Sequence, residues 1–243
     1  MLTLALETSS LAGSVALVAG DDLLLQWSLD ADRRSAQTLA PAIDGLLNEA
    51  GVRPADVRLV AVTVGPGSFT GLRVGVTTAK TFAYAVGAEV LGVDTLETIA
   101  HQAVPRPLVG VRLGGSLVLP GSELHAVLDA QRKDLFLARF AWQESGLVRL
   151  DANRIVPADA WLASLVQGTT VTGPGLDRWQ SRLPAGVIAV DPALRQPQAE
   201  TVGRLAIEHY RAGRRDDLWK LAPRYLRPSA AEEKVGQVFN LPQ

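Results

Sequence analysis

Residues 59–87 constrain the fold of this chain more than any other stretch, because they join a buried strand, a tight turn and a long helix in a fixed order. An apolar run rich in β-branched residues fills residues 59–64 and stops at Gly65-Pro66-Gly67, which is typical of a buried strand that ends in a turn. Ser68 follows and suits a helix N-cap, since its hydroxyl can accept a hydrogen bond from a free amide of the first turn. The stretch therefore predicts a strand that leads directly into a helix.

The predicted helix carries a small residue at every fourth position. These residues share one helix face, and they are Gly71, Gly75, Ala79, Ala83 and Gly87. An interior glycine costs roughly 1 kcal/mol of helix stability relative to alanine, so the stripe predicts the close approach of another backbone. That backbone belongs either to the chain's own sheet or to a partner molecule, and the residues alone favour neither. The glycine turn before the helix has neither the lysine of a P-loop nor GxGxxG spacing, so it gives only a weak indication of a phosphate site.

Composition narrows the class of protein. The 243 residues are 47% apolar and 20% charged, which fits one large globular domain or two modest ones. There is no cysteine, which excludes thiol catalysis and thiolate metal sites. The formal net charge of −1 provides no global field that would draw the chain to nucleic acid or to a membrane. Glu7 interrupts the first apolar run, and no segment approaches the roughly 20 apolar residues of a membrane span, so we expect a cytoplasmic protein without a signal peptide.

The N-terminal residues predict a three-stranded antiparallel meander over residues 2–6, 14–18 and 23–29. Its first turn is polar and consists of Glu7, Thr8, Ser9 and Ser10. In the ATPases that include actin and sugar kinases, the turn at this place carries an acidic residue and amides that meet phosphate. We therefore assign these four residues to a vestigial nucleotide-binding turn, although a simple polar hairpin turn explains them equally well.

The rest of the chain repeats the opening pattern. Strands are predicted at residues 124–128, 135–142 and 147–155, and Gly173-Pro174-Gly175 precedes a predicted helix at residues 176–182, much as the first glycine turn precedes its helix. We expect an N-terminal lobe over residues 1–104, a linker or insertion over 105–122, and a second, smaller lobe over 123–199. An amphipathic helix at about 200–213 is expected to pack back on the first lobe, with a mobile tail at 228–243. The basic residues after this helix indicate either a solvated surface or a partner contact.

Four motifs, in order and over nearly the whole chain, resemble the TsaB (YeaZ) family. They are LALETSSLAGSVALV, VTVGPGSFTGLRVGVTTAKTFAYAVGAEVLGVDTLETIA, HAVLDAQRKDLFLARF and PRYLRP, of which the second is highly specific. The resemblance implies an α/β fold of the actin-like ATPase type (ASKHA, related to RNase H) with two duplicated lobes. It also implies a role in forming threonylcarbamoyladenosine beside the anticodon of tRNAs that read codons beginning with A.

The same resemblance implies that the chain is not an enzyme. The catalytic relatives, TsaD, carry GVNHxEGH, whose two histidines hold a metal, and the corresponding run here is residues 92–99. Thr95 and Ile99 stand at the two histidine positions, and a hydroxyl and an alkyl group cannot replace two imidazoles on a metal. We therefore expect no catalytic residue and no metal site. The alternative is an ATP-dependent phosphotransferase or hydrolase of the same fold.

The family further implies a partner surface made by two helices, at about residues 35–50 and 70–86. They are expected to pair with TsaD in a heterodimer, or with a second copy of the chain when it is alone. We assign to this interface the apolar and small residues Leu39, Ile43, Leu46, Gly71, Leu72, Gly75, Ala79 and Ala83. The resemblance also implies TsaE as a partner, tRNA bound only indirectly through the complex, and no membrane contact. No tightly bound cofactor is expected, with ATP or ADP bound only at an interface shared within the complex.

Overall fold

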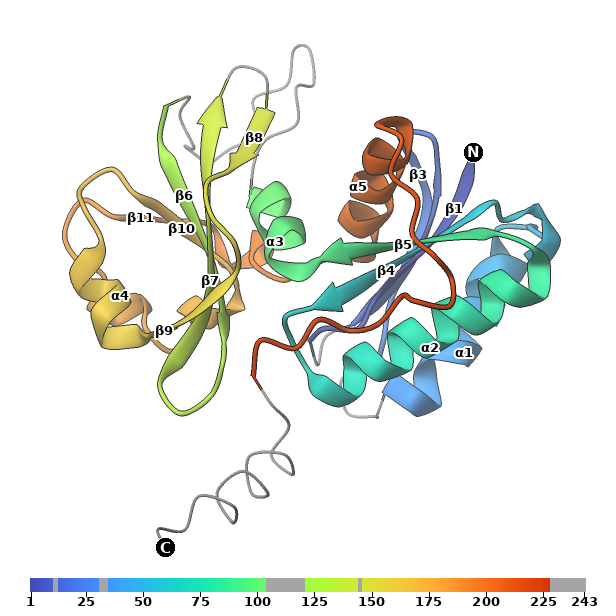
Figure 1. The fold of residues 1–243 in the computed structure, drawn as a ribbon, viewed down its shortest axis with the longest axis horizontal. Helices are drawn as coiled ribbons and strands as arrows, with labels where there is room; N and C mark the ends of the chain where they lie inside the picture. The colour runs from blue at the N-terminus through green and yellow to red at the C-terminus, as the bar shows by residue number, and fades with distance from the viewer. Residues whose placement is uncertain (11–12, 31–34, 104–120, 144–145, 228–243) are drawn as a thin grey trace, which may run out of the picture.

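The structure is a computed structural model that describes residues 1–10, 13–30, 35–103, 121–143 and 146–227 of the chain. Two lobes lie side by side, each built on its own β-sheet, with helix α3 (Thr95–Ala103) between them (Figure 1). The linker expected at 105–122 and the tail expected at 228–243 lie almost entirely outside the described residues.

The first lobe contains a five-stranded sheet in the order β3-β2-β1-β4-β5. The meander strands pair antiparallel, whereas β1, β4 and β5 run parallel to one another. The strands are β1 (Leu2–Glu7), β2 (Ser14–Ala19), β3 (Asp22–Ser28), β4 (Leu59–Gly65) and β5 (Glu89–Asp94). All seven residues of β4 are buried, as its continuous apolar run predicts for a central parallel strand.

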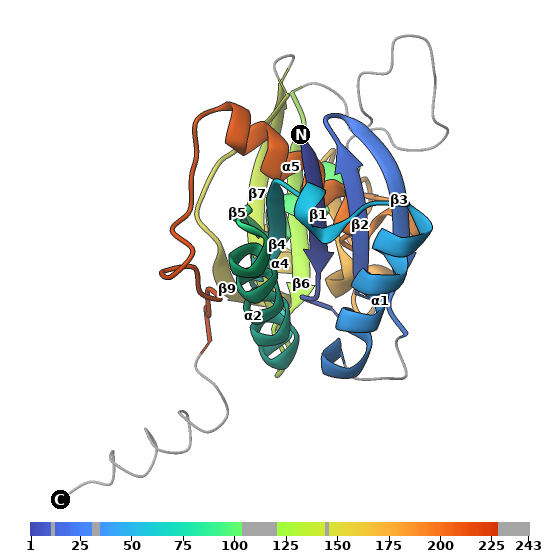
Figure 2. The same ribbon diagram turned by 90° about the vertical axis from the view of Figure 1, so that its right-hand side faces the viewer.

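Helices cover both faces of this sheet. The helices α1 (Ser35–Glu49) and α2 (Phe69–Val86) lie on one face, and α5 (Ala199–Arg211) lies on the other (Figure 2). Ser68 caps α2 as predicted, since its hydroxyl accepts a hydrogen bond from Gly71 N at 3.2 Å. Gly87 ends the helix with a left-handed φ of 73°, which glycine adopts without steric cost.

The second lobe repeats the strand order of the first. Its sheet runs β8-β7-β6-β10-β11, with β6, β7 and β8 antiparallel and β6, β10 and β11 parallel. The elements are β6 (Glu123–Asp129), β7 (Asp134–Gln143), β8 (Gly146–Arg149), β9 (Arg154–Pro157), α4 (Ala158–Ser164), β10 (Thr170–Thr172) and β11 (Ile188–Ala189). The repeated order confirms the predicted α/β fold with two actin-like lobes.

Two details of the second lobe differ from the prediction. The single strand expected at 147–155 is two short strands, β8 and β9, which pair with different parts of β7. The helix expected at 176–182 is absent from the described residues, where the 3₁₀ turns Pro174–Leu176 and Gln180–Arg182 stand instead. The remaining 3₁₀ turns are Pro54–Asp56 and Pro192–Leu194.

After α5, residues 212–227 form an extended segment that we call the C-terminal strap (Figure 1). Asp216 accepts a hydrogen bond from Gly92 N at 2.9 Å, and Arg224 N donates to Val64 O at 2.7 Å. The strap then reaches the second lobe, where the Arg227 guanidinium bonds Asp134 and the carbonyl of Ala130. The strap therefore ties the two lobes together.

Among the described residues, no helix has both the length and the apolar character that crossing a bilayer requires.

Candidate functional site

In the predicted nucleotide-binding turn, the polar groups form hydrogen bonds with one another. Glu7 is fully buried, and its Oε1 accepts hydrogen bonds from Ser9 N at 2.7 Å and from the Thr63 hydroxyl at 3.4 Å. The Ser9 hydroxyl also donates to Oε1, and the Ser10 hydroxyl donates to Oε2 at 3.3 Å. Burial raises the pKa of Glu7 to about 7, and the four donors offset only part of that effect. The acidic side chain thus serves as a local acceptor inside the first lobe.

The glycines of α2 make room for this turn. A Cβ built on Gly71 would lie 2.1 Å from Thr8 O, and one on Gly75 would lie 2.1 Å from Thr8 Oγ1. A Cβ on Gly67 would lie 2.5 Å from Ser9 O. The backbone that approaches the small-residue stripe therefore belongs to the chain's own first turn. The assignment of Gly71 and Gly75 to a partner interface is wrong.

The other six residues assigned to that interface are also unavailable to a partner. All are at most 5% exposed, and they are Leu39, Ile43, Leu46, Leu72, Ala79 and Ala83. Their side chains face the sheet, because an amphipathic helix buries its apolar stripe against its own core. The helical periodicity identified the inward face correctly, but that face was mistaken for the partner face.

Neither a phosphate nor a metal fits the places where the fold family would hold them. In the first turn, the carboxylate already has four donors, and Thr8 O and Thr8 Oγ1 lie against α2. Thr95 and Ile99 are fully buried at the start and middle of α3, and the pair offers a single hydroxyl. No group of three or more His, Cys, Asp or Glu residues that could hold a metal occurs within the described part of the chain.

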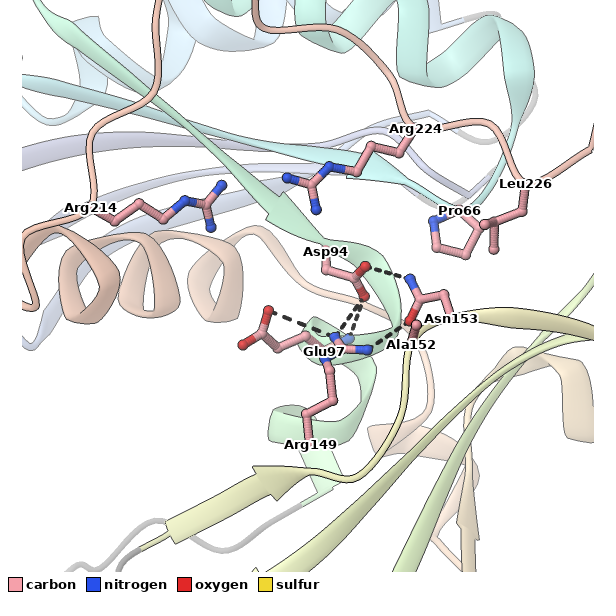
Figure 3. A pocket seen from close by; sticks show the side chains of 9 residues that line it. All are labelled: Pro66, Asp94, Glu97, Arg149, Ala152, Asn153, Arg214, Arg224 and Leu226. Carbon is pink, nitrogen blue, oxygen red and sulfur yellow. Dashed lines mark hydrogen bonds and ion pairs between the residues drawn. The ribbon is translucent and has the colours of Figure 1, made fainter.

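A polar cavity of about 350 Å³ lies between the lobes instead (Figure 3). It is lined by β5, α3 and the strap on one side and by the β8–β9 connection on the other. The lining residues are Pro66, Asp94, Glu97, Arg149, Ala152, Asn153, Arg214, Arg224 and Leu226. Three guanidinium groups and two carboxylates thus face one space, where they can hold the lobes together or bind a polar ligand.

Asp94 is the centre of the contact between the lobes. It accepts hydrogen bonds from Arg149 Nη2 at 3.2 Å and from the Asn153 side-chain amide, both of which belong to the second lobe. It also caps α3 by accepting from Glu97 N at 3.0 Å, with Glu97 at the third helical position as in a capping box. Arg149 further stacks on the Phe140 ring at 4.7 Å, which fixes its guanidinium at the cavity wall.

The cavity carboxylates are already matched by cations. Glu97 Oε1 lies 3.3 Å from His209 Nε2, and Glu97 Oε2 lies 3.9 Å from Arg149. Burial raises the pKa of Glu97, but the His209 hydrogen bond and the nearby positive charges outweigh it and leave this pKa below its usual value. Arg214 is held by Asp216 at 2.8 Å and by the carbonyl of Gly92 at 2.7 Å. The carboxylates of Asp94 and Glu97 are therefore paired with basic side chains of the protein itself.

Sequence reasoning missed most of this cavity. Arg149, Asn153 and Arg214 belong to no family motif, whereas Pro66, Asp94 and Glu97 lie in the second motif and Arg224 and Leu226 lie in PRYLRP. The sequence around Asp94 has only the local pattern of a helix cap, since Glu97 follows it by three residues. The one available signal was the cluster of basic residues after α5, which was left open between a solvated surface and a partner contact.

The comparisons with known proteins agree with the fold. The family model for TsaD, tRNA N6-adenosine threonylcarbamoyltransferase, matches residues 29–117. The chain is 28% identical to the tRNA threonylcarbamoyladenosine biosynthesis protein TsaB of Bacillus subtilis over 68% of its length and 66% of that protein's. It is 27% identical to the protein of the same name from Escherichia coli, over 97% of this chain and 98% of that one. The solved structure of YeaZ from Pseudomonas aeruginosa is 26% identical in sequence and has a TM-score of 0.74. The match covers 93% of this chain and 99% of that one.

The chain is thus similar, over nearly its whole length, to proteins named TsaB or YeaZ.

Proposed function

We propose that this chain takes part in tRNA threonylcarbamoyladenosine biosynthesis as a non-catalytic subunit that binds a TsaD-type transferase. The pathway comes from the names of its relatives in Bacillus subtilis and Escherichia coli. The observation that carries the non-catalytic role is the burial of Thr95 and Ile99, which by the resemblance stand at the two positions of the metal-binding histidines in TsaD-like chains. Neither side chain supplies a nitrogen ligand.

The closed first turn supports the same role and disfavours the ATP-dependent alternative. A nucleotide phosphate needs free amides and a cation or metal. Here Glu7 engages the Ser9 amide, while Thr8 packs against Gly71 and Gly75 of α2 and Ser9 packs against Gly67. We therefore propose that the chain binds no nucleotide of its own in this turn.

The outward faces of α1 and α2 are the surface we propose for the partner. On α2, Arg73, Thr77 and Thr81 are exposed, and on α1, Ala36 and Ala40 are exposed. The short side chains of Thr77, Thr81, Ala36 and Ala40 permit another pair of helices to approach closely. The proposal keeps the two helices that the family implies but moves the contact to the opposite face. The same surface would serve a second copy of the chain in a homodimer.

The test is to mix the purified chain with its TsaD-type protein and measure the molar mass by analytical ultracentrifugation. A heterodimer is expected, and Thr77→Arg should abolish it by placing a long side chain in the contact. Ala163→Arg, on the exposed face of α4, is the matched control and should assemble normally. Unchanged assembly of Thr77→Arg would remove these helices from the interface.

The activity of the subunit is tested by reconstitution. Modification of tRNA by TsaC, TsaD and TsaE should require this chain, and should be lost with Thr77→Arg but retained with Glu7→Gln. Calorimetry with ATP and Mg²⁺ on the isolated chain should show no binding. Micromolar binding that is lost in Glu7→Gln would favour the ATP-dependent enzyme instead.

A further inference from the structure

The C-terminal strap and α2 together present a basic surface with exposed aromatic rings. Trp219 of the strap is 73% exposed and Tyr84 of α2 is 68% exposed. Their rings meet edge to face, with centroids 5.6 Å apart. Two large exposed rings in contact cost free energy in water, which marks the place as an interaction surface.

This aromatic pair is held in position by the protein. Lys80 Nζ donates to the carbonyl oxygens of Trp219 at 3.1 Å and Leu221 at 3.0 Å. Asp217 Oδ1 accepts from Trp219 N at 2.8 Å and from Lys220 N at 3.2 Å. The main chain at Trp219 is thus fixed while its indole remains exposed, so little order would have to be gained on binding.

A second aromatic group lies at the other end of α2. The rings of Phe69 and Tyr225 stack with centroids 4.5 Å apart. Arg73 lies 3.9 Å above the Phe69 ring and donates to the Tyr225 hydroxyl at 3.0 Å. Tyr225 is 41% exposed, so this group also offers an edge to solvent. The strap therefore contacts α2 at two aromatic groups, with basic side chains at both.

The charge of this surface differs from that of the whole chain. Helix α2 contains Arg73 and Lys80 and no acidic residue. Residues 217–227 of the strap contain one carboxylate, Asp217, and the basic side chains Lys220, Arg224 and Arg227. Lys220 is 86% exposed and forms a solvent-exposed ion pair with Asp217 at 3.7 Å, while Arg227 is paired with Asp134. Arg224 is exposed, but its guanidinium lines the cavity between the lobes. A chain of net charge −1 thus concentrates positive charge beside its exposed rings.

We infer that the surface formed by the strap and α2 binds single-stranded RNA directly, with bases stacking on Trp219 and Tyr84 and phosphates meeting Lys220. Exposed aromatic rings beside positive charge are the combination that single strands recognise without sequence preference, because every base has a flat face and every nucleotide a negative charge. The inference goes beyond the proposed function, because the family resemblance implies that tRNA is bound only through a partner. It concerns the isolated chain, so it can be tested separately.

The test is fluorescence anisotropy of a fluorescein-labelled ten-nucleotide single-stranded RNA titrated with the full-length chain. Wild-type protein should bind, and Trp219→Ala should weaken binding by about 5- to 100-fold, the usual range for loss of one base stack. Lys220→Ala should lower the slope of log affinity against log salt by about 0.7. The controls are Val166→Ala, an exposed apolar residue of the second lobe, and Arg53→Ala, an exposed cation far from the strap in sequence. Both controls should bind as wild type.

Three outcomes would overturn the inference: no binding by wild type, equal binding of a ten-base-pair RNA duplex, or binding unchanged in both strap variants. Analytical ultracentrifugation with the TsaD-type protein separates the inference from the proposed function. If Trp219→Ala prevents that assembly but leaves RNA affinity unchanged, the surface binds protein and the RNA inference fails. If Thr77→Arg has no effect on assembly while RNA binding depends on Trp219, the proposed interface fails and the inference stands.

Discussion

The Thr8 hydroxyl occupies the space in which a side chain at Gly75 would begin, since a Cβ on Gly75 would lie 2.1 Å from Thr8 Oγ1. The first turn of the sheet and the long helix after β4 are therefore fitted to each other without a gap. The glycines of α2 pack inside the first lobe. This contact determines how a substitution at Gly71 or Gly75 changes the stability of the protein.

Gly71→Ala should destabilise the protein by about 2 kcal/mol or more, despite the better helix propensity of alanine. The new methyl group would lie 2.1 Å from the Thr8 carbonyl, which cannot move without shifting β1. Urea unfolding measures the change, and Thr81→Ala on the exposed face of α2 is the control, expected within about 0.5 kcal/mol of wild type. Equal stability of the two variants would contradict the packing described.

Gly75→Ala differs from Gly71→Ala because its new methyl group would meet a side chain. Removal of the Thr8 hydroxyl should therefore rescue it: Thr8→Ala with Gly75→Ala should be more stable than Gly75→Ala alone. The next contact, Thr8 Cβ at 3.2 Å, is tight but tolerable after small shifts. Thr8→Ala should give no such rescue to Gly71→Ala, whose obstacle is the backbone. A rescue of both or of neither would show that the hydroxyl is not the obstacle.

The fold could be predicted largely from local patterns. The β4 run, the Ser68 cap and the Gly87 stop lie within 30 residues of one another, so sequence spacing alone defines this strand, turn and helix. The repeat of strand order in the second lobe was also visible, although its short strands and 3₁₀ turns blurred the pattern. Residues 147–155 look like one strand because the bend between β8 and β9 has no glycine or proline to mark it.

The site could not be predicted in the same way, for two physical reasons. Helical spacing tells which residues share a face but not which neighbour covers that face, so the stripe at Gly71 and Gly75 was assigned to a partner. The cavity depends on residues far apart in sequence, such as Asp94 and Arg149, which meet only when the lobes pack. The exposed Trp219 has no sequence signal either, because exposure is set by the path of the strap.

Glu7 should make the stability of the protein depend on pH between about 4.5 and 7. Its folded pKa of about 7 lies above the ordinary 4.5, so the folded state binds the proton more tightly than the unfolded state. This contribution to stability is fully present below pH 4.5 and is lost as the pH rises through 7, by about 3 kcal/mol in total. Urea unfolding of wild type and Glu7→Gln from pH 4.5 to 8 isolates the effect, because other titrating groups are common to both. A stability difference independent of pH would refute the buried acid.

The hydrogen bond from Trp161 to His125 should stabilise the second lobe. Trp161 Nε1 donates to His125 Nδ1 at 3.1 Å, so the ring proton is on Nε2, 2.9 Å from Glu123 Oε1. Trp161→Phe should remove the donor and cost about 1–3 kcal/mol beyond the loss of ring area. Trp179→Phe is the matched control, since this indole is also buried and has no such bond among the described contacts. Similar losses in the two variants would assign the effect to packing alone.

The pH dependence from His125 has the opposite sign to that from Glu7. Burial lowers the pKa of His125, and the Glu123 hydrogen bond offsets this only in part. Because the folded pKa lies below the unfolded value, the stability from neutral His125 is present above pH 6.5 and is lost as the pH falls through the folded pKa. His125→Gln should therefore be less sensitive than wild type to acidification below pH 6.5. An unchanged acid slope would show that His125 does not titrate in this way.

The contact between the lobes should loosen when Arg149 is removed. Arg149→Gln would leave Asp94 with Asn153 and the Glu97 amide, so the expected loss is about 1–2 kcal/mol for a partly buried pair. Amide hydrogen exchange should become faster in α3 and β8, which face each other across the cavity, and not in α1. Arg154→Gln is the control, because its contact with Asp151 at 3.6 Å stays within the second lobe. Equal exchange of α3 in the two variants would mean that the strap, through Arg227 and Asp134, holds the lobes together without help from the cavity.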